Sequence, residues 1–347
     1  MSEPTRPSRV AVDAMGGDHA PRVVVEGALA ACRELGLAVV LVGPEAAIRE
    51  ELRRAGGGAA GATVLDAPDV VGMGEKVSRS TLKKRSSIQV GLELVRDRGA
   101  DAFFSAGNTA VCWTIARMVL GTLEEVDRPA LAAVVPNVEG FTVLIDVGAN
   151  AQCKARQLEE FAVMGNVYTR AVLHKDSPRV GLMSMGEEET KGNDLTREVH
   201  EVLKDSALNF IGNVEGHDVF NGKVDVIVMD GFTGNVALKA SESLAASIMY
   251  LLRQELVRTP LARLGALLSS RALRAVKRRI DPAEYGGAPL LGVQGCCVIG
   301  HGGSNAMAIK HGIRTAAEFF SSGVNEKIGA ELRSLGLRKE AEPLGTA

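Results

Sequence analysis

The amino-acid sequence predicts an α/β fold, in which a mostly parallel sheet is covered by helices on both faces. Short apolar runs rich in Val, Leu and Ile alternate along the chain with segments whose apolar residues recur every three or four positions. The apolar runs are continuous, which is typical of parallel strands that are buried on both faces. Glycines and polar residues follow most of these runs, where strands of such a sheet turn into helices.

The first strand and helix set this pattern. Residues 10–13 form a short apolar run that ends in Asp13, two glycines follow, and Pro21 precedes a helical pattern over 23–35. Proline is tolerated at a helix start because the N–H that it lacks would be unpaired there. We therefore expect a strand, a glycine turn and a helix.

The later elements repeat the pattern. Further strands are expected at residues 37–42, 63–65, 102–106, 130–135, 141–146, 179–183, 209–214, 224–229 and 296–299. Helices are expected at residues 45–55, 88–96, 110–120 and 158–174, after residue 193 and from residue 306. A hairpin-like link is expected at 136–140, so the sheet is mixed, although mostly parallel.

Length and composition indicate a globular protein with a substantial core. The chain has 347 residues, of which 46% are hydrophobic. We expect a single domain over residues 9–335, a flexible N-terminus at 1–8 and a flexible tail at 336–347. The 40 basic and 42 acidic residues give a net charge of −2, so no overall field attracts the protein to nucleic acid.

Several classes of protein are disfavoured by what the sequence lacks. The five cysteines show no Cys-x-x-Cys spacing, and no His, Cys and carboxylate set has ligand spacing, so we expect reduced thiols and no metal. The turn after the first strand lacks the Gly-x-Gly-x-x-Gly fingerprint of dinucleotide sites, and no cofactor is expected. We find no apolar signal-peptide core and no apolar run of about 18 residues. These features predict a cytoplasmic protein.

Polar residues gather where the expected strands end. At least five separated strand ends carry glycine with Asp, Asn, Ser or Thr, and ligands bind at the carboxyl ends of strands in such sheets. One such end is ordinary turn chemistry, but their accumulation predicts a shared polar cleft. At the first end, N–H groups and the helix dipole suit an anion, with Asp13, Gly16 and Gly17 as candidates. A turn without a ligand is the alternative.

Two further stretches are candidates for phosphate binding. Lys84, Ser86 and Ser87 combine positive charge with the amides of a helix start, although a solvated helix start explains them as well. Asn108 and Thr109 offer polar side chains at a helix entrance, where simple capping is the alternative.

A histidine lies at the end of the last expected strand. His301 is flanked by glycines rather than placed in an apolar stripe, which favours a role in the site over a buried structural role.

Residues 241–280 depart from the alternation of strands and helices. Their apolar residues recur at helical spacing on both sides of Pro260, and no acidic residue occurs between Leu256 and Ile280. An amphipathic, basic pair of helices suits an anionic membrane or an acidic protein partner. A helical hairpin that packs against a second subunit is the alternative. The candidate contact residues are Arg258, Arg263, Arg271, Arg274 and Lys277.

Six blocks of the sequence together resemble one known family. In chain order they are Val12-Asp13-Ala14-Met15-Gly16-Gly17-Asp18, Ser105-Ala106-Gly107-Asn108-Thr109, Asp146-Val147-Gly148-Ala149-Asn150, Asn213-Val214-Glu215-Gly216, Asp230-Gly231-Phe232-Thr233-Gly234-Asn235-Val236 and Tyr285-Gly286-Gly287-Ala288-Pro289-Leu290-Leu291-Gly292. On these blocks the chain resembles the PlsX family of bacterial acyl-acyl-carrier-protein:phosphate acyltransferases. Two positions depart from the family pattern. Ala110 replaces a glycine, and His301-Gly302-Gly303-Ser304 replaces the commoner His-Gly-Ser-Ser.

The resemblance implies a fold, an assembly and a reaction. The implied fold is a three-layer α/β/α sandwich like that of isocitrate and isopropylmalate dehydrogenases and of phosphotransacetylases, with a protruding helical hairpin. The implied assembly is a homodimer that associates peripherally with an anionic membrane and serves a downstream acyltransferase of phospholipid synthesis. In the implied reaction, a long-chain acyl group passes from acyl carrier protein (ACP) to inorganic phosphate and gives acyl phosphate.

Residue chemistry and position within the blocks assign roles to the candidates. The residues expected to bind phosphate and the oxyanion are Asn108, Thr109, Lys191, Asn235, Gly302, Gly303 and Ser304, with Lys84, Ser86 and Ser87 as a second cluster. Lys191, Asp230 and His301 are the expected catalytic residues. His301 would handle a proton or orient the substrate, and Asp230 would fix a catalytic partner.

Other functions stay open at this point. A phosphotransacetylase that acts on acyl-CoA shares the chemistry. A non-catalytic, membrane-associated protein that binds acyl ligands would carry the same basic helices. A dehydrogenase on the related fold is a further alternative, and a lack of nicotinamide binding would exclude it.

Overall fold

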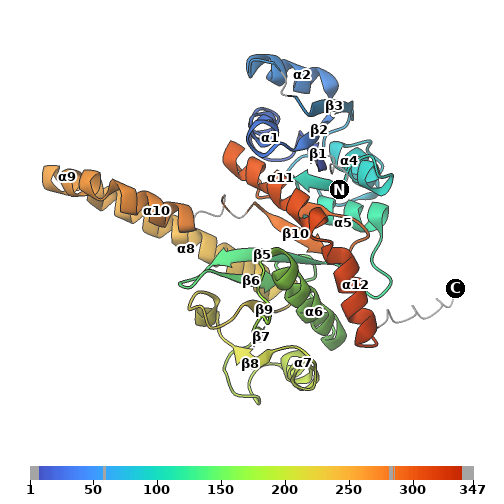
Figure 1. Cartoon of the computed structure of the whole chain (residues 1–347), viewed down its shortest axis with the longest axis vertical. Helices are drawn as coiled ribbons and strands as arrows, with labels where there is room; N and C mark the ends of the chain where they lie inside the picture. Colours follow the sequence, from blue (N-terminus) through green and yellow to red (C-terminus); the bar gives the residue numbers. More distant parts are fainter. Residues whose placement is uncertain (1–7, 58–59, 281–283, 285, 338–347) are drawn as a thin grey trace, which may run out of the picture.

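The computed structural model describes residues 8–57, 60–280, 284 and 286–337. Its strands are β1 (Arg9–Asp13), β2 (Ala38–Gly43), β3 (Ala62–Asp66), β4 (Ala102–Ser105), β5 (Ala130–Pro136), β6 (Phe141–Ile145), β7 (Val180–Met183), β8 (Phe210–Val214), β9 (Val226–Val228), β10 (Ala288–Leu291) and β11 (Cys297–Ile299). Within the described residues these strands form one sheet in the order β3-β2-β1-β4-β11-β10-β5-β6-β9-β7-β8 (Figure 1).

Helices flank this sheet. They are α1 (Arg22–Leu35), α2 (Glu45–Arg54), α3 (Arg79–Leu82), α4 (Ser87–Arg96), α5 (Thr109–Leu120), α6 (Ala155–Val172), α7 (Asp194–Lys204), α8 (Gly231–Arg258), α9 (Pro260–Leu268), α10 (Ser270–Ile280), α11 (Ala306–Ser321) and α12 (Val324–Ser334), with a short 3-10 helix η1 (Gly216–Val219). The predicted flexible ends lie almost entirely outside the described residues. They stay predictions, as does the single domain over 9–335.

The sheet reverses direction halfway across. The strands from β3 to β4, and β11 beside β4, run parallel to one another. β10 is antiparallel to both β11 and β5, and β5 is antiparallel to β6. The strands β6, β9, β7 and β8 again run parallel to one another. The predicted mixed, mostly parallel sheet is therefore confirmed, and its two halves point in opposite directions.

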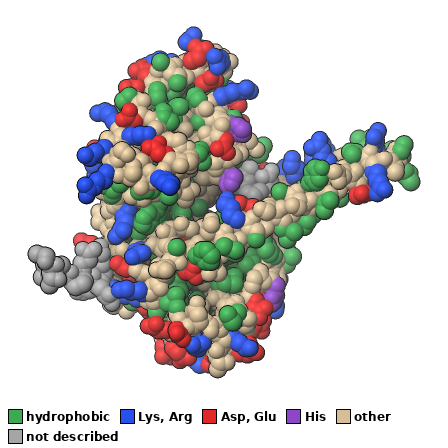
Figure 2. All heavy atoms as spheres, turned by 180° about the vertical axis from the view of Figure 1, so that it is seen from behind, with side chains coloured by type: hydrophobic (Ala, Val, Ile, Leu, Met, Phe, Trp, Pro, Cys, Tyr) green, Lys and Arg blue, Asp and Glu red, His purple; other side chains and the backbone are tan. Residues whose placement is uncertain are grey.

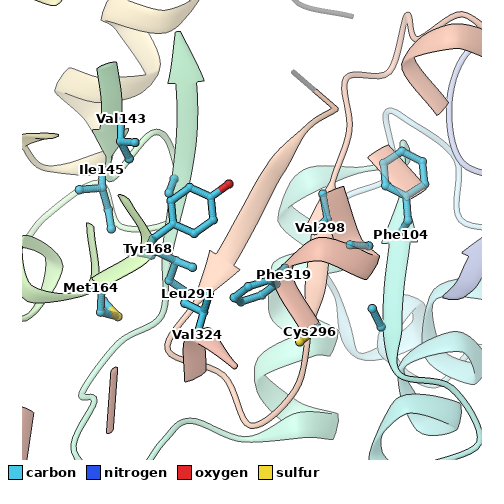
Figure 3. Close-up of a cluster of buried hydrophobic side chains, with 14 of the residues drawn as sticks. Phe104, Val143, Ile145, Met164, Tyr168, Leu291, Cys296, Val298, Phe319 and Val324 are labelled. Carbon is cyan, nitrogen blue, oxygen red and sulfur yellow. The ribbon is translucent and has the colours of Figure 1, made fainter. Parts of the chain in front are cut away.

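Buried side chains form a hydrophobic cluster on each face of the sheet. One cluster contains Leu29 of α1, Phe319 of α11 and Val10 of β1, and Figure 3 shows part of it. The other contains Ile115 of α5 and Ala11, the next residue of β1. Successive strand residues thus face opposite layers, which makes the fold a three-layer sandwich. A fully buried Leu or Phe contributes about 2 kcal/mol relative to an exposed one.

The ten strands expected from the sequence are all present, but one strand was not expected. β10 lies in the Tyr-Gly-Gly-Ala-Pro block, where glycine and proline are typical of a loop. Pro289 has no N–H to donate, yet it occupies the second position of this short strand. Tertiary pairing with β5 and β11 therefore outweighs the weak local preference.

The helical segment expected to begin at Ser241 begins ten residues earlier, at Gly231. The Asp230 carboxylate caps this helix by accepting a hydrogen bond from the Thr233 N–H, with the two atoms 2.9 Å apart. Glycines at 231 and 234 lower helix propensity, and this hid the true start from the sequence pattern. The prediction of Ser241 as the boundary is corrected accordingly.

The predicted protruding hairpin is confirmed. α8 extends away from the sheet, and α9 and α10 lie along the projecting part of α8 (Figure 1). Figure 2 shows hydrophobic and basic side chains along these helices; Leu261, Leu267 and Leu268 are 79%, 70% and 78% exposed. No helix in the described part of the chain combines the length and apolar character needed to cross a membrane.

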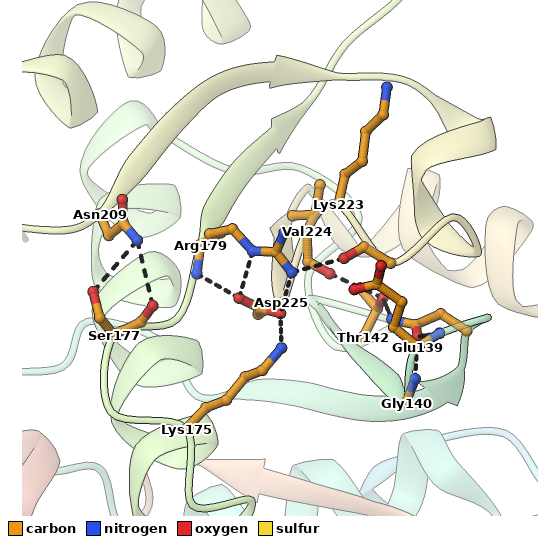
Figure 4. Close-up of polar contacts among 12 residues, drawn as sticks. Glu139, Gly140, Thr142, Lys175, Ser177, Arg179, Asn209, Lys223, Val224 and Asp225 are labelled. Carbon is orange, nitrogen blue, oxygen red and sulfur yellow. Dashed lines mark hydrogen bonds and ion pairs between the residues drawn. The ribbon is translucent and has the colours of Figure 1, made fainter.

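A buried carboxylate ties together two strands of the second half. Asp225, which is 3% exposed, precedes β9 and accepts hydrogen bonds from the backbone and guanidinium of Arg179 before β7, and from Lys175 (Figure 4). Burial raises the pKa of Asp225, but the hydrogen bonds from Arg179 and Lys175 outweigh it and hold the pKa below 3.8.

We expect this network to make stability depend on acid pH. Because the pKa of Asp225 is lower in the folded chain than in the unfolded chain, its stabilising contribution is complete above the unfolded value and is lost as the pH falls through the folded value. Asp225→Asn should lower the unfolding free energy at pH 7 by about 2 kcal/mol, the usual contribution of hydrogen bonds to a charged group, and should flatten its decline between pH 5 and pH 2. Urea denaturation across that range measures both.

Asp194→Asn is the matched control, since Asp194 is fully exposed and pairs with Arg197 on its own helix. It should change stability by less than about 0.5 kcal/mol. An unaltered pH slope in Asp225→Asn would contradict the role given to this network.

Candidate active site

One cleft collects most of the polar strand ends. It has a volume of about 1240 Å³, and it extends from the loops after β4 and β11, across β5, to the first half of α8. The predicted site residues in its wall are Thr109, Asn235, His301, Gly302, Gly303 and Ser304. The structure therefore brings these six predicted residues together in one cleft.

The register of the sheet explains how two oppositely directed halves share this cleft. Ser105 at the end of β4 pairs with Ile299, which pairs with Ala288. β10 pairs with β5 through Leu290 and Leu131, and extending this register by two residues brings the row to Ala133. Ile145, at the end of β6, pairs with the preceding residue Ala132. The loops that leave β4 and β6 therefore start at nearly the same level of β5, although the strands arrive from opposite sides.

A buried carboxylate organises the loops of the first half. Asp13 is 2% exposed and accepts a 2.7 Å hydrogen bond from the Ser105 hydroxyl, which in turn accepts one of 3.0 Å from the Gly107 N–H. Burial raises the pKa of Asp13, and hydrogen bonds from Ser87 and Ser105 partly oppose this. A Cβ on Gly16 would lie 2.6 Å from the Asp13 carboxylate, so only glycine fits this approach.

A matching carboxylate organises the loops of the second half. Asp146, which is fully buried, accepts hydrogen bonds from the N–H groups of Gly148, Ala149 and Asn150 at 3.1, 3.0 and 2.6 Å. Burial raises its pKa, and these hydrogen bonds oppose the rise. A Cβ on Gly234 of α8 would lie 1.9 Å from the Asp146 carbonyl oxygen. In each half of the sheet, a buried aspartate accepts hydrogen bonds from the loop after a strand, and a glycine allows a close backbone approach.

Two helices begin at the cleft, and a third runs along it. Thr109 is the first residue of α5, and Gly302 and Gly303 precede α11, whereas α8 begins at Gly231, before its first lining residue Asn235. A helix N-terminus carries unpaired N–H groups and the positive end of the helix dipole. Their convergence makes the polar part of the cleft suitable for an anion such as phosphate.

His301 has a defined hydrogen-bonding state in this cleft. Its Nδ1 accepts a hydrogen bond of 3.1 Å from the Gly303 N–H, so the neutral ring carries its proton on Nε2. The Ser304 hydroxyl donates to the His301 carbonyl oxygen. The ring is exposed and can donate from Nε2 to a bound group.

The amide of Asn108 is engaged in structural contacts. Its oxygen accepts from the Val111 N–H at 3.1 Å and caps α5, and its nitrogen donates to the carbonyls of Met73 and Glu75 at 2.8 and 2.9 Å. In the structure, Asn108 therefore acts as a helix cap, which was the alternative to phosphate binding. Through Met73, which also lines the cleft, Asn108 positions a neighbouring loop.

The second predicted phosphate cluster does not gather at the cleft. Lys84 pairs with Glu75 at 2.8 Å, and Ser86 is buried and caps α4 through the Gln89 N–H. Ser87 is buried behind the first loop, where it hydrogen-bonds to Asp13. These three residues support the loops rather than line the cleft.

The remaining two predicted catalytic residues lie outside the lining as well. Asp230 caps α8 by accepting from both the N–H and the hydroxyl of Thr233. Lys191 is exposed in the loop between β7 and α7. The structure therefore brings His301 to the cleft, but neither Asp230 nor Lys191.

Sequence reasoning missed Asp18 and the apolar walls. The Asp18 N–H donates to the Gly302 carbonyl at 2.9 Å and the residue lines the cleft. Its place in the Gly-Gly-Asp block was a usable signal. The apolar walls come from β5 and α8, where an exposed cleft residue and a core residue have the same sequence pattern.

One group of donor side chains within the described residues lies close enough for a metal. Glu187, His217 and Asp218 bring ligand atoms within 4.8 Å of one another. Sequence spacing could not indicate it, because Glu187 lies in the loop after β7, whereas His217 and Asp218 lie in η1. His217 and Asp218 already contact each other at 3.4 Å, and Asp218 accepts from the Glu215 N–H. These contacts account for the group, and we assign it no metal.

Comparison with known proteins identifies the family. A family model described as "Fatty acid synthesis protein" matches residues 8–327. A relative from Acidobacterium capsulatum named "Phosphate acyltransferase" is 52% identical over 324 residues, which cover 93% of this chain and 96% of the relative. A relative of the same name from Geotalea daltonii is 48% identical and covers 94% of each chain.

Solved structures support the fold. A phosphotransacetylase from Streptococcus pyogenes has a TM-score of 0.63 at 19% identity, over 90% of this chain and 94% of that one. A branched-chain phosphotransacylase from Enterococcus faecalis has a TM-score of 0.56 at 14% identity, over 90% and 99%. The predicted likeness to phosphotransacetylases is thus confirmed at the level of the fold, and the family match with its relatives confirms the resemblance of the sequence blocks. The chain belongs to the fatty acid synthesis protein family, the PlsX family of acyltransferases.

Proposed function

We propose that this enzyme transfers a long-chain acyl group from acyl-ACP to inorganic phosphate and supplies acyl phosphate for phospholipid synthesis. A phosphate oxygen attacks the thioester carbonyl carbon, so a C–O bond forms and the C–S bond breaks. The carrier protein leaves as a thiolate and takes up a proton. Because phosphate is already anionic near pH 7, the enzyme's task is to position it against the carbonyl rather than to activate it.

The convergence of two helix starts and Asn235 of α8 in one cleft carries this proposal. The N–H of Gly302 and the side chains of Thr109 and Asn235 offer donors to phosphate, while the Gly303 N–H holds His301. The same donors can stabilise the oxyanion that forms during attack, where one preorganised donor contributes about 3 kcal/mol.

His301 is the group proposed to handle the proton. With Nδ1 held by the Gly303 N–H, Nε2 is the position that donates to the oxyanion or to the departing sulfur. Asp230 acts by fixing the start of α8, which carries Asn235. Lys191 would add positive charge if its loop approaches the cleft when substrate is bound.

The basic helices α9 and α10 are proposed to meet the acidic carrier protein and an anionic membrane. Arg271, Arg274 and Lys277 are exposed on α10, and their charge favours both partners. A homodimer, and delivery of the product to a membrane-bound downstream acyltransferase, belong to the same proposal.

The reaction is tested by incubating the enzyme with hexadecanoyl-ACP and labelled phosphate. Labelled acyl phosphate should form, and hexadecanoyl-CoA should be used less efficiently. Equal or preferred use of the CoA thioester would replace the carrier-protein donor by the phosphotransacetylase alternative. Binding of acyl ligands without phosphate-dependent turnover would overturn catalysis. Lys191→Ala tests the contribution of the loop after β7.

Charge reversal on α10 tests the partner assignment. We expect Arg271→Glu with Arg274→Glu to weaken use of acyl-ACP or binding to anionic vesicles about tenfold, because two contacts of about 1 kcal/mol each become repulsive. Kinetics with acyl-ACP and vesicle sedimentation measure the two effects.

Arg53→Glu with Arg54→Glu is the matched control on the exposed helix α2, whose two arginines pair within that helix. It should leave both assays unchanged. If the α10 variant behaves like this control in both assays, α10 is not the contact surface.

A further inference from the structure

We propose that the apolar part of the cleft, between β5 and α8, is the binding groove for the acyl chain. The proposal rests on the proposed function and adds the location of the chain. The polar end of the same cleft holds the residues assigned to phosphate, so the thioester carbonyl would lie where the two parts meet.

Both walls of the groove carry apolar residues. β5 contributes a nearly continuous apolar run, and α8 contributes apolar residues beside the polar Lys239, Ser241 and Glu242. The apolar lining residues from these two elements are Leu131, Ala133, Val134, Val135, Pro136, Leu238, Leu244, Ala245 and Ile248. Such a surface stabilises a chain of methylene groups and offers little to a second phosphate or a sugar.

The size of the cleft fits a long chain. Its volume of about 1240 Å³ exceeds the roughly 300–1,000 Å³ of ordinary small-molecule pockets. Its lining follows β5 and the next link from residue 131 to residue 138, a wall of about 23 Å at the rise of a strand. Phosphate and a thioester would occupy the polar end alone.

Val138 and Phe220 line the far end of the groove, where they are 68% and 40% exposed. The Val138 N–H donates to the Phe220 carbonyl. Arg279 of α10 donates to the carbonyls of Asn137 and Val138 at 3.0 and 2.7 Å. These hydrogen bonds connect the base of the projecting helices to the groove.

Two adjacent alanines of α8 give a matched test. Ala245 lines the groove, whereas Ala246 is exposed and does not. Ala245→Trp should lower kcat/KM for hexadecanoyl-ACP at least about tenfold relative to octanoyl-ACP, the effect of displacing roughly two methylene groups from an apolar site. The KM for phosphate should stay unchanged. Ala246→Trp should leave the chain-length ratio unchanged.

A binding measurement separates the groove from the reaction. A fluorescent hexadecanoate analogue should bind the wild type and Ala246→Trp equally, and bind Ala245→Trp about tenfold more weakly. If the wild type makes no acyl phosphate, the proposed function fails, and this titration still decides the groove.

The groove proposal would be overturned if Ala245→Trp lowered kcat/KM equally for hexadecanoyl-ACP and octanoyl-ACP. It would also be overturned if this variant bound the analogue as tightly as the wild type. A change of oligomeric state in Ala245→Trp without a change of the chain-length ratio would identify the surface as a contact between subunits instead.

Discussion

Replacing His301 by asparagine is expected to lower kcat with hexadecanoyl-ACP by about a hundred- to thousandfold. The asparagine oxygen can accept the hydrogen bond that the Gly303 N–H now donates to Nδ1, so the loop should keep its shape. The amide nitrogen can donate a hydrogen bond but cannot transfer a proton, which removes general acid catalysis. Single-turnover formation of acyl phosphate gives the chemical step, and the KM for phosphate should change less than kcat.

His174→Asn is the control for this variant. His174 is exposed, lies after α6 and has a φ of 56°, a conformation that asparagine adopts readily. Its kcat should equal that of the wild type. If His301→Asn keeps more than about a tenth of the wild-type kcat, a proton-transferring role for this ring is wrong.

Gly234→Ala is expected to lower the unfolding free energy by about 3 kcal/mol, the upper part of the usual cost of overpacking. A Cβ there would lie 1.9 Å from the carbonyl oxygen of Asp146, which is backbone and cannot rotate away. Relief requires the start of α8 to move, and Asn235 would move with it, so activity should fall as well. Urea denaturation and the acyl phosphate assay measure the two losses.

Gly265→Ala is the matched control, because a Cβ at this position in α9 meets nothing within 4 Å. Alanine is favoured over glycine inside a helix by about 1 kcal/mol, so this variant should be as stable as the wild type or more so. Equal stability of the two variants would contradict the close approach of α8 to the loop after β6.

Much of the fold was predictable because it depends on local periodicity. The continuous apolar runs at β1 and β2 and the helical spacing of α1 and α6 are properties of the segments themselves. β10 and the start of α8 were not predictable, because glycine or proline in these segments disfavours a strand or a helix. Partners distant in the chain hold both segments in place. The reversal of the sheet is a property of strand order, which no local pattern encodes.

The site was predictable in outline but not in detail. Glycine beside polar residues marked Thr109, Asn235 and the His301 loop correctly as cleft residues. The same composition serves hydrogen bonds between loops at Asp13 and Ser87, and it caps a helix at Asp230. Turn chemistry and ligand chemistry use the same side chains, so the sequence alone cannot separate a contact residue from the residue behind it.

The position of β10 has a consequence for how the protein is made. This strand comes from residues 288–291, yet it joins the two halves of the sheet through β11 and β5. Until β10 and β11 have left the ribosome, β5 and β4 each expose an unpaired edge. Such late, long-range pairing slows folding and invites aggregation. We expect the nascent chain to depend on chaperones until its last sixth is synthesised.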